Sequence, residues 1–504
     1  MIRFPGRDNL RRALFHPLTG IITGAAAIRL IGISTRGIQY DDAFSILLAG
    51  RPLAEIMKGT AADTMPPLYY LILHLWQQLG TSVAFQRLPG IVFSLGIILV
   101  SYSLVNRLAG RQAAIWTAAI LAVSPLQFYH AQDIRMYSLA TLFILGWDWF
   151  AIQMDRVEDP IKMPVWKWLL MVICGAGALY SHALAGFGLL APFGYYLCKK
   201  DRKRLISCFA AGVFSLVLYF PWLVMVPGQI AKVQHAFWTP VPGIVEVIQA
   251  VIMVLGDIPS PAWVLGFVLF AILMITILCG MEFFRHKQDN APLLFFTLMT
   301  LIPPICLFLL SYLMRPMFVP RGFLSGYVGI SACIGVLGSR SRKIEQILIG
   351  GLILVSSLVT LPVSINYESF PRSPFQPASQ YLLSEMKNDD IVLHDNKLSF
   401  FPFQVYAPGL NQRFLADQPG SANDTLARQT SDALHLTSFI YIDPDDAVQG
   451  FSRIFFVVFS QTIQEYSTTG GHPVIRNLDL KFGKPIEHAF GDLLILEYHS
   501  VRDD

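Results

Sequence analysis

Long apolar runs separated by short polar segments fill the first 365 residues of the chain. A helix needs about 20 mostly apolar residues to cross a bilayer, and eleven runs approach this length. The pattern therefore predicts a polytopic α-helical membrane domain over residues 1–365, with about eleven spans. The runs lie near residues 14–34, 84–106, 113–129, 136–154, 165–182, 184–198, 205–226, 262–283, 292–313, 320–338 and 344–364.

After about residue 366 the long runs give way to short alternating segments, which are typical of strands and short helices. Residues 378–387 predict a helix. The combination predicts a small soluble α/β domain over residues 366–504. The expected strands lie at 390–394, 438–442, 453–460 and 493–498.

The first long polar segment, residues 35–83, contains a stretch that is apolar yet too short to span. Residues 66–80 are only fifteen long and lie between Pro66-Pro67 and Gly80. If they spanned, every later basic loop would change sides, so we expect an amphipathic helix along the outer interface. Residues 243–255 are expected to behave in the same way.

Charge separates the two parts of the chain. Only 14% of the residues are charged and 54% are hydrophobic, whereas soluble proteins average about 25% charged, which excludes a single soluble domain. Residues 1–365 carry 28 Lys+Arg and 16 Asp+Glu, net +12, and residues 366–504 carry 10 and 18, net −8. The positive charge lies in short loops between apolar runs. We therefore expect a lipid bilayer as a partner and no nucleic acid.

The basic loops recur after every second apolar run, as the positive-inside rule requires of a cytoplasmic side. Loop 35–83 and residues 366–504 then fall on the other side. This predicts a multi-pass protein of the cell (inner or plasma) membrane with an extracytoplasmic C-terminal domain. The basic residues are Arg3, Arg7, Arg11 and Arg12, then Arg107 and Arg111, Lys162 and Lys167, residues 199–204, Arg285 and Lys287, and Arg340, Arg342 and Lys343.

Charged side chains near a membrane are costly, so those on the outer side are informative. Asp41 and Asp42 are adjacent and point about 100° apart on a helix, so only one of them would face a ligand. Alternatively, the pair caps the helix expected over residues 43–48. Both interpretations fit the residues.

A second polar cluster lies in the outer turn 124–137, which holds Asp133, Arg135 and Tyr137. His182 and Arg321 lie at the ends of other runs on the same side. Arginine makes forked contacts with phosphate, so these residues fit an anion site. An interfacial aromatic belt with arginines that reach the lipid head groups would have the same composition.

The order of these motifs resembles the GT-C superfamily of polyprenyl-phosphate-sugar glycosyltransferases, which includes protein O-mannosyltransferases and the lipid A aminoarabinose transferase. The resemblance covers about residues 35–325. Met65 stands where the family often has His, and Asp133 stands where it has Glu. The matching segments are Asp41-Asp42-Ala43-Phe44-Ser45, residues 63–70 with Pro66-Pro67-Leu68-Tyr69-Tyr70, Arg87-Leu88-Pro89, Gln132-Asp133-Ile134-Arg135-Met136-Tyr137, Tyr180-Ser181-His182 and Pro320-Arg321.

The resemblance implies an inverting hexosyl- or pentosyltransferase on the outer face of the membrane. Its donor would be a polyprenyl-phosphate-linked sugar, and its acceptor a glycolipid, polysaccharide or protein hydroxyl. No cofactor is implied; paired acids leave a divalent metal open, but no His or Cys cluster supports one. The implied roles are Asp41 as base and Asp42 as its orienting neighbour, Arg135, Arg321 and Lys58 at the donor phosphate, and Asp63, Asp133, Tyr137, His182 and Tyr69 at the acceptor or in supporting positions.

Two other classes of protein fit the hydrophobic pattern. A lipid or glycolipid transporter or flippase would also have many spans, but no internal repeat is visible, and few charges lie in the apolar runs. A membrane-anchored receptor would leave the outer motifs unexplained. The motifs therefore favour the transferase.

Overall fold

The computed structural model describes residues 17–235, 239–285, 290–421 and 423–499. The N-terminal arginines of the first basic segment, and Lys287, lie outside these residues. The chain forms two compact units. We call residues 1–33, 64–69 and 81–365 the membrane unit, and residues 34–63, 70–80 and 366–504 the loop–sheet unit.

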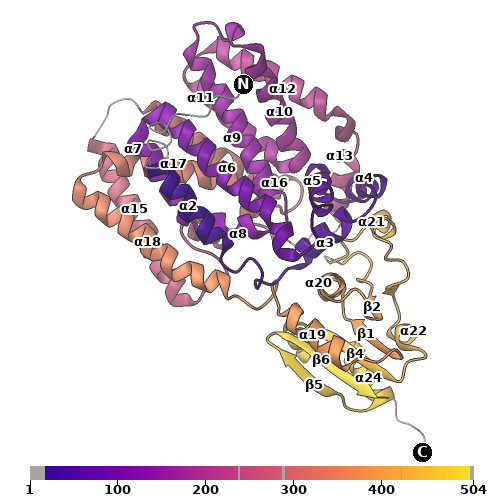
Figure 1. Ribbon diagram of the computed structural model, residues 1–504. Helices are drawn as coiled ribbons and strands as arrows, with labels where there is room; N and C mark the ends of the chain where they lie inside the picture. The colour runs from indigo at the N-terminus through magenta and orange to yellow at the C-terminus, as the bar shows by residue number, and fades with distance from the viewer. Residues whose placement is uncertain (1–16, 236–238, 286–289, 422, 500–504) are drawn as a thin grey trace, which may run out of the picture. The chain divides into compact units, whose positions relative to one another are not determined.

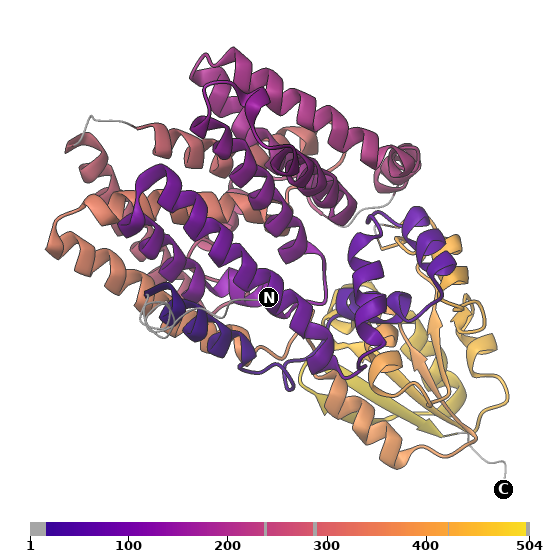
Figure 2. The ribbon, with the colours of Figure 1, turned by 45° about the horizontal axis from the view of Figure 1, so that its top comes forward.

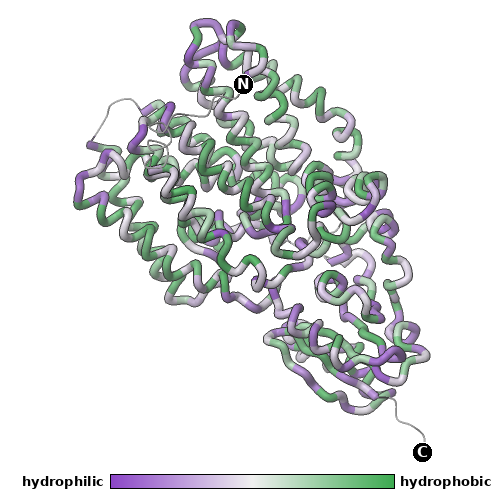
Figure 3. The backbone as a smooth tube through the Cα atoms, viewed as in Figure 1, coloured by the Kyte–Doolittle hydropathy of each residue, from purple (hydrophilic) through white to green (hydrophobic). Residues whose placement is uncertain are grey.

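Six helices in the described residues are long and apolar enough to cross a membrane. Figure 3 shows hydrophobic residues along most of their length, as expected for helices that face lipid. The chain is therefore a multi-pass membrane protein. These helices are α6 (Val83–Ala109), α12 (Arg202–Leu223), α15 (Ala262–Arg285), α16 (Ala291–Leu313), η4 with α17 (Pro320–Phe323 and Leu324–Arg340) and α18 (Lys343–Ile365).

The other five predicted runs also fall on helical segments, but these are shorter (Figure 1). The count of eleven spans therefore stays a prediction. A helix also forms within residues 243–255, where an amphipathic one was expected. The shorter elements are α2 (Pro17–Leu30), α7 (Arg111–Val123), α8 (Pro125–Gln132), α9 (Tyr137–Gln153), η1 (Met154–Arg156), η2 (Pro160–Lys162), α10 (Val165–Ser181), η3 (Ala183–Leu190), α11 (Ala191–Cys198), α13 (Val226–His235) and α14 (Ile244–Ile252).

Two buried contacts hold the ends of α7 and α8, the two helices that precede the turn into α9. The guanidinium of Arg29, fully buried in α2, donates to the carbonyls of Leu121 and Ala122 at 3.0 Å, which compensates its burial. Gly90 in α6 lets the turn approach closely, because a Cβ there would lie 2.6 Å from the carbonyl oxygen of Ala131. The turn therefore sits against α6 with little freedom to move.

The loop–sheet unit is built on a six-stranded sheet of order β3-β2-β1-β4-β6-β5. Strands β1 to β4 run parallel, and β6 and β5 pair antiparallel at one edge. The α/β character predicted for residues 366–504 is confirmed. The strands are β1 (Asp390–His394), β2 (Gln412–Leu415), β3 (Ile440–Tyr441), β4 (Arg453–Phe459), β5 (Ile486–Phe490) and β6 (Leu493–His499).

Central strands β1 and β4 are buried on both faces, so apolar layers form on each side of the sheet. Ile391, Ile454 and Phe456 belong to one layer, and Val392 and Phe455 to the other. Short helices cover these layers. They are α19 (Phe375–Glu385), α20 (Lys397–Tyr406), α21 (Arg428–Ala433), α22 (Pro444–Val448), α23 (Ser460–Glu465), η5 (Ser467–Thr469) and α24 (Pro473–Phe482).

Segments of residues 34–80 complete the same unit. They form α3 (Tyr40–Ala49), α4 (Leu53–Ala62) and most of α5 (Leu68–Gln77). Helix α3 packs on α20, and α4 packs on α21, as the purple and orange ribbons of Figure 2 show. The unit therefore contains chain segments that lie more than 300 residues apart in the sequence.

Candidate functional site

The α8–α9 turn holds one end of the candidate site. Ser124 is the N-cap of α8, and its hydroxyl accepts a hydrogen bond from the backbone N–H of Gln127 at 3.4 Å. Pro125 follows in the first turn, where its missing N–H costs nothing. The helix ends at Gln132, because the backbone of the next residue, Asp133, is extended. The Asp133 carboxylate lies 3.0 Å from His130 Nδ1, and both side chains are buried. The turn is thus held by its own polar side chains.

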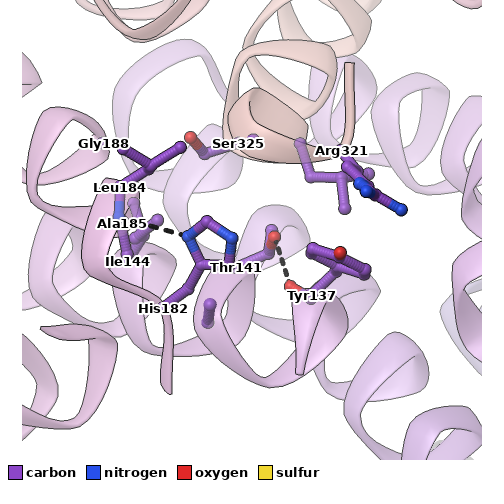
Figure 4. A pocket seen from close by; sticks show the side chains of 12 residues that line it. Tyr137, Thr141, Ile144, His182, Leu184, Ala185, Gly188, Arg321 and Ser325 are labelled. Atoms are coloured by element: carbon purple, nitrogen blue, oxygen red, sulfur yellow. Dashed lines mark hydrogen bonds between the residues drawn. The ribbon is translucent and has the colours of Figure 1, made fainter. Parts of the chain in front are cut away.

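A row of rings leads from this turn across the membrane unit. The ring centroids of His130 and Tyr137 lie 5.3 Å apart, and those of Tyr137 and His182 lie 5.7 Å apart. The guanidinium of Arg321 lies over the ring of Tyr137, with its Cζ 5.7 Å from the ring centroid. These side chains come from α8, from α9, from the end of α10 and from η4. Three segments far apart in the sequence therefore meet at Tyr137 (Figure 4).

The tautomer of a neutral His182 ring follows from its hydrogen bond. Its Nδ1 accepts a hydrogen bond from the backbone N–H of Leu184 at 3.2 Å, so a neutral ring carries its proton on Nε2. The guanidinium groups of Arg321 and Arg135 both interact electrostatically with this ring. In Figure 4 the second ring nitrogen points away from Leu184, toward the side of Tyr137 and Arg321. His182 is therefore a hydrogen-bond donor on this side.

These residues line a pocket whose other wall combines small and aliphatic residues. A Cβ at Gly188 would lie 2.6 Å from Ile144 Cδ1 and 3.1 Å from Ser325 Oγ, so a larger residue there would fill the space. Tyr137 Oη is buried and, within the described part of the chain, has no hydrogen-bond partner. A buried hydroxyl without a partner is costly. The lining residues are Tyr137, Ala140, Thr141, Ile144, His182, Leu184, Ala185, Gly188, Arg321, Gly322, Leu324 and Ser325.

The donors around the pocket match an anion. A guanidinium, a ring N–H and a phenol O–H are all present, and the charge of Arg135 adds to that of Arg321 at His182. Charge-assisted hydrogen bonds of this kind are the strong ones for phosphate oxygens. Chemically, the arrangement fits a phosphate group better than a neutral sugar.

The paired acids lie in the loop–sheet unit, and the structure assigns them different environments. Asp42 is fully buried, and its Oδ2 accepts from the backbone N–H of Gln39 at 3.2 Å, so it caps α3. Asp41 is only partly buried, in the first turn of the same helix. The pair thus divides into one capping carboxylate and one carboxylate that solvent reaches.

The structure brings together some of the predicted site residues. Arg135, Tyr137, His182 and Arg321 meet in the membrane unit, and Asp133 joins them through His130. Of the other predicted residues, Tyr69 is buried and belongs to the membrane unit. The remaining four belong to the loop–sheet unit: Asp41 and Asp42 lie in α3, Lys58 is exposed on α4, and Asp63 is the C-cap of α4.

Sequence reasoning missed three polar residues of this region. His130 pairs with Asp133, Thr141 Oγ1 donates to the carbonyl of Tyr137 at 2.9 Å, and Ser325 lines the pocket. The spacing of three residues between His130 and Asp133 was a visible signal, because such neighbours face each other across a helical turn. Among the described residues, no group of three or more His, Cys, Asp and Glu is placed to hold a metal ion.

The fold of the chain is similar to that of solved membrane glycosyltransferases of the GT-C superfamily, which agrees with the resemblance predicted from the motifs. In particular, the chain is similar to ArnT from Cupriavidus metallidurans bound to undecaprenyl phosphate, with TM-score 0.63, 12% identity, and 95% of this chain and 97% of that chain covered. The apo state of that protein gives TM-score 0.62, 13% identity and the same coverage.

A second relative is the archaeal oligosaccharyltransferase AglB from Archaeoglobus fulgidus, in complex with an inhibitory peptide and a dolichol-phosphate. The TM-score is 0.52 at 11% identity, over 97% of this chain and 74% of that chain. No family model matches the chain, and no curated protein matches it either. At such low identity the likeness establishes the fold.

Proposed function

We propose that the protein is an integral-membrane inverting glycosyltransferase, which moves a sugar from a polyprenyl-phosphate donor to an acceptor hydroxyl on the outer face of the membrane. The observation that carries this proposal is the cluster of donors at the pocket. Arg321, Tyr137 and the Nε2–H of His182 surround a space in which the phenol is buried without a partner. A phosphate would supply the missing acceptor.

The phosphate end of the reaction follows from this cluster. Arg321 and Arg135, with Lys58, offset the charge that the lipid phosphate gains as its bond to the sugar breaks, and Tyr137 and His182 donate to its oxygens. A phosphate is already a good leaving group, so no strong general acid is needed. The comparison structures support the choice of lipid, because they hold undecaprenyl phosphate in one case and dolichol-phosphate in the other.

The other end of the reaction needs a base. The acceptor oxygen attacks the anomeric carbon, the bond from that carbon to the phosphate oxygen breaks, and the acceptor proton passes to Asp41. Displacement in one step inverts the anomeric centre. Asp42 holds the first turn of α3 through Gln39, and so orients its neighbour. Asp63, Asp133 and Tyr69 are assigned to the acceptor side or to supporting positions, and the acceptor is a glycolipid, a polysaccharide or a protein.

The test uses the full chain in proteoliposomes made with the total lipid extract of the source cells, and measures released polyprenyl phosphate by mass spectrometry. Asp41→Asn should lower the release by about 10²–10⁴-fold, the usual effect of removing a catalytic base. Asp389→Asn, an exposed carboxylate before β1, is the matched control. Wild-type release from Asp41→Asn would contradict the role of Asp41.

The same assay separates the transferase from the transporter alternative. A flippase would move a lipid-linked sugar between leaflets and leave the bond between sugar and phosphate intact. Transbilayer movement without release of polyprenyl phosphate would therefore favour the transporter. Release with transfer of the sugar mass to a second molecule supports the transferase.

A further inference from the structure

Helix α20 of the C-terminal domain contacts two residues of α3, one before and one after Asp41 in the sequence. The ring of Phe401 meets that of Tyr40 edge-on at 4.9 Å and stacks on that of Phe44 at 6.1 Å. Phe401 is fully buried. The first turn of α3 is therefore packed against a side chain that comes about 360 residues later in the chain.

The backbone that leads into α3 is also held by the C-terminal domain. The N–H of Ile38 donates to Tyr406 Oη at 3.3 Å, and the guanidinium of Arg372 donates to the carbonyl of Gly37 at 3.2 Å. Arg372 is itself buried. These bonds fix the two residues that precede the N-cap, Gln39, and so determine where the helix begins.

Helix α4, which follows α3, is held at two further points. Thr430 Oγ1 donates to the carbonyl of Gly59 at 3.1 Å. His435 lies between Arg51 and Glu55, with 3.1 Å from Nδ1 to the guanidinium and 3.1 Å from Nε2 to the carboxylate. Residues 37–59 are thus tied to the C-terminal domain through Arg372 and through side chains of α20, of α21 and of the residues that follow α21.

Helix α3 depends on these contacts for its position. It is ten residues long, and isolated helices below about 12 residues are marginal in water. Its own N-terminal cap, between Gln39 and Asp42, orders the first turn but does not place it. Helix α5 holds the C-terminal half of α3, where Gln77 Nε2 donates to the carbonyl of Ile46 at 3.0 Å, and the packing on α20 places the first turn.

We propose that the C-terminal α/β domain is a positioning element for the base, in which Phe401 and Tyr406 hold the first turn of α3 and thereby set the location of Asp41. This inference rests on the proposed function. It gives the C-terminal domain a part in the transfer reaction without contact with the substrate. The two side chains are positioning residues, because they act on the acceptor proton only through α3.

The experiment compares Tyr406→Phe and Phe401→Leu with the wild-type full chain in the proteoliposome assay. Tyr406→Phe removes one hydrogen bond, so turnover should fall by about two- to tenfold. Affinity for undecaprenyl phosphate, the probe for the donor site, should not change. Hydrogen exchange of residues 37–49 should become faster while exchange of strands β1 and β4 stays the same. Thr430→Val should have a smaller effect, because it loosens α4 rather than α3.

Tyr498→Phe is the matched control. It also removes a hydroxyl hydrogen bond, from β6 to Asp479 of α24 at 3.0 Å, and should leave both turnover and exchange at residues 37–49 unchanged. A positioning role is overturned if Tyr406→Phe and Phe401→Leu keep wild-type turnover while Asp41→Asn is inactive. It is also overturned if turnover falls as much in Tyr498→Phe, since the effect would then be general destabilisation. Full turnover in Asp41→Asn would overturn the proposed function and, with it, the role of α20.

Discussion

The guanidinium of Arg321 lies over the ring of Tyr137, with Cζ 5.7 Å from the ring centroid. The aromatic face favours one orientation of the planar group. A lysine in its place would keep the charge but lose both the stacking and the forked geometry. The contact thus explains why the residue type, and not only the charge, should matter here.

Arg321→Lys is therefore expected to weaken the binding of undecaprenyl phosphate by about 1.5–3 kcal/mol, the value of one hydrogen bond to a charged group. Binding is measured by native mass spectrometry in detergent. Arg340→Gln, at the far end of α17, is the control and should bind as the wild type does. If the lysine variant binds undecaprenyl phosphate as tightly as the wild type, the paired N–H groups of the Arg321 guanidinium do not contact the phosphate.

Tyr137→Phe should have opposite effects on stability and on ligand binding. The Tyr137 hydroxyl is buried without a partner in the described residues, so its removal should leave the melting temperature unchanged or raise it. The same change should weaken undecaprenyl phosphate binding, because one donor to the phosphate is lost. A variant that is less stable but binds normally would contradict the anion-site interpretation.

Gly90→Ala should disturb the turn that carries Asp133 and Arg135. The added Cβ would lie 2.6 Å from a backbone oxygen, which cannot rotate away. Overpacking of this kind costs about 1–3 kcal/mol, and we expect a lower melting temperature together with lower transfer activity. Gly280→Ala in α15 is the control, because no atom lies within 4 Å of its Cβ position. That change should be neutral or slightly stabilising.

The stability of the loop–sheet unit should fall as the pH is lowered from about 6.5. Burial lowers the pKa of His394 in β1 to about 3. An unfolded chain binds this proton at the ordinary pKa while the folded chain does not, so the stability contribution is present above pH 6.5 and is lost progressively toward pH 3, by up to about 1.4 kcal/mol per pH unit. Hydrogen exchange of β1 between pH 7 and pH 5 measures this slope. His394→Gln should flatten it, and an unchanged slope would assign the effect to other groups.

The C-terminal domain and the Asp41 loop should share the non-cytoplasmic side. A cysteine introduced by Ser421→Cys, in a chain whose six native cysteines are replaced, should react with a membrane-impermeant maleimide on intact cells. The six basic loops motivate this orientation. Labelling that requires permeabilisation would reverse the topology, and with it the proposed side of the reaction.

Much of the fold was visible in the sequence because it rests on local patterns. The apolar runs predicted the helices of the membrane unit, and β1 was predicted with its observed bounds because all five of its residues are buried. Strand β2 was missed since it is only four residues long and includes Gln412, a buried polar residue that bonds to His394. Strand β5 was missed because it lies at the edge of the sheet and is largely exposed.

The site was visible only in part for a related reason. The motifs at Tyr137, His182 and Arg321 were recognised separately in the sequence. The positive-inside rule assigned all three to the same side of the membrane, which made it reasonable to expect them close together. The packing of α3 on α20 had no local signal, since residues such as Ile38 and Tyr406 are 368 positions apart. Nothing in the neighbourhood of either residue in the sequence reports the other.

That separation has a consequence for the order of events at the ribosome. At about 5–20 residues per second, synthesis needs about 20–70 s to pass from Ile38 to Tyr406, which lie 368 positions apart. During this interval the first outer loop lacks the helix it packs against, and the last membrane helix, α18, must be made before the C-terminal domain appears. A chain that stalls or is truncated before residue 366 therefore carries Asp41 and Asp42 without the helix that packs on α3, so the proposed transfer reaction should require the complete polypeptide.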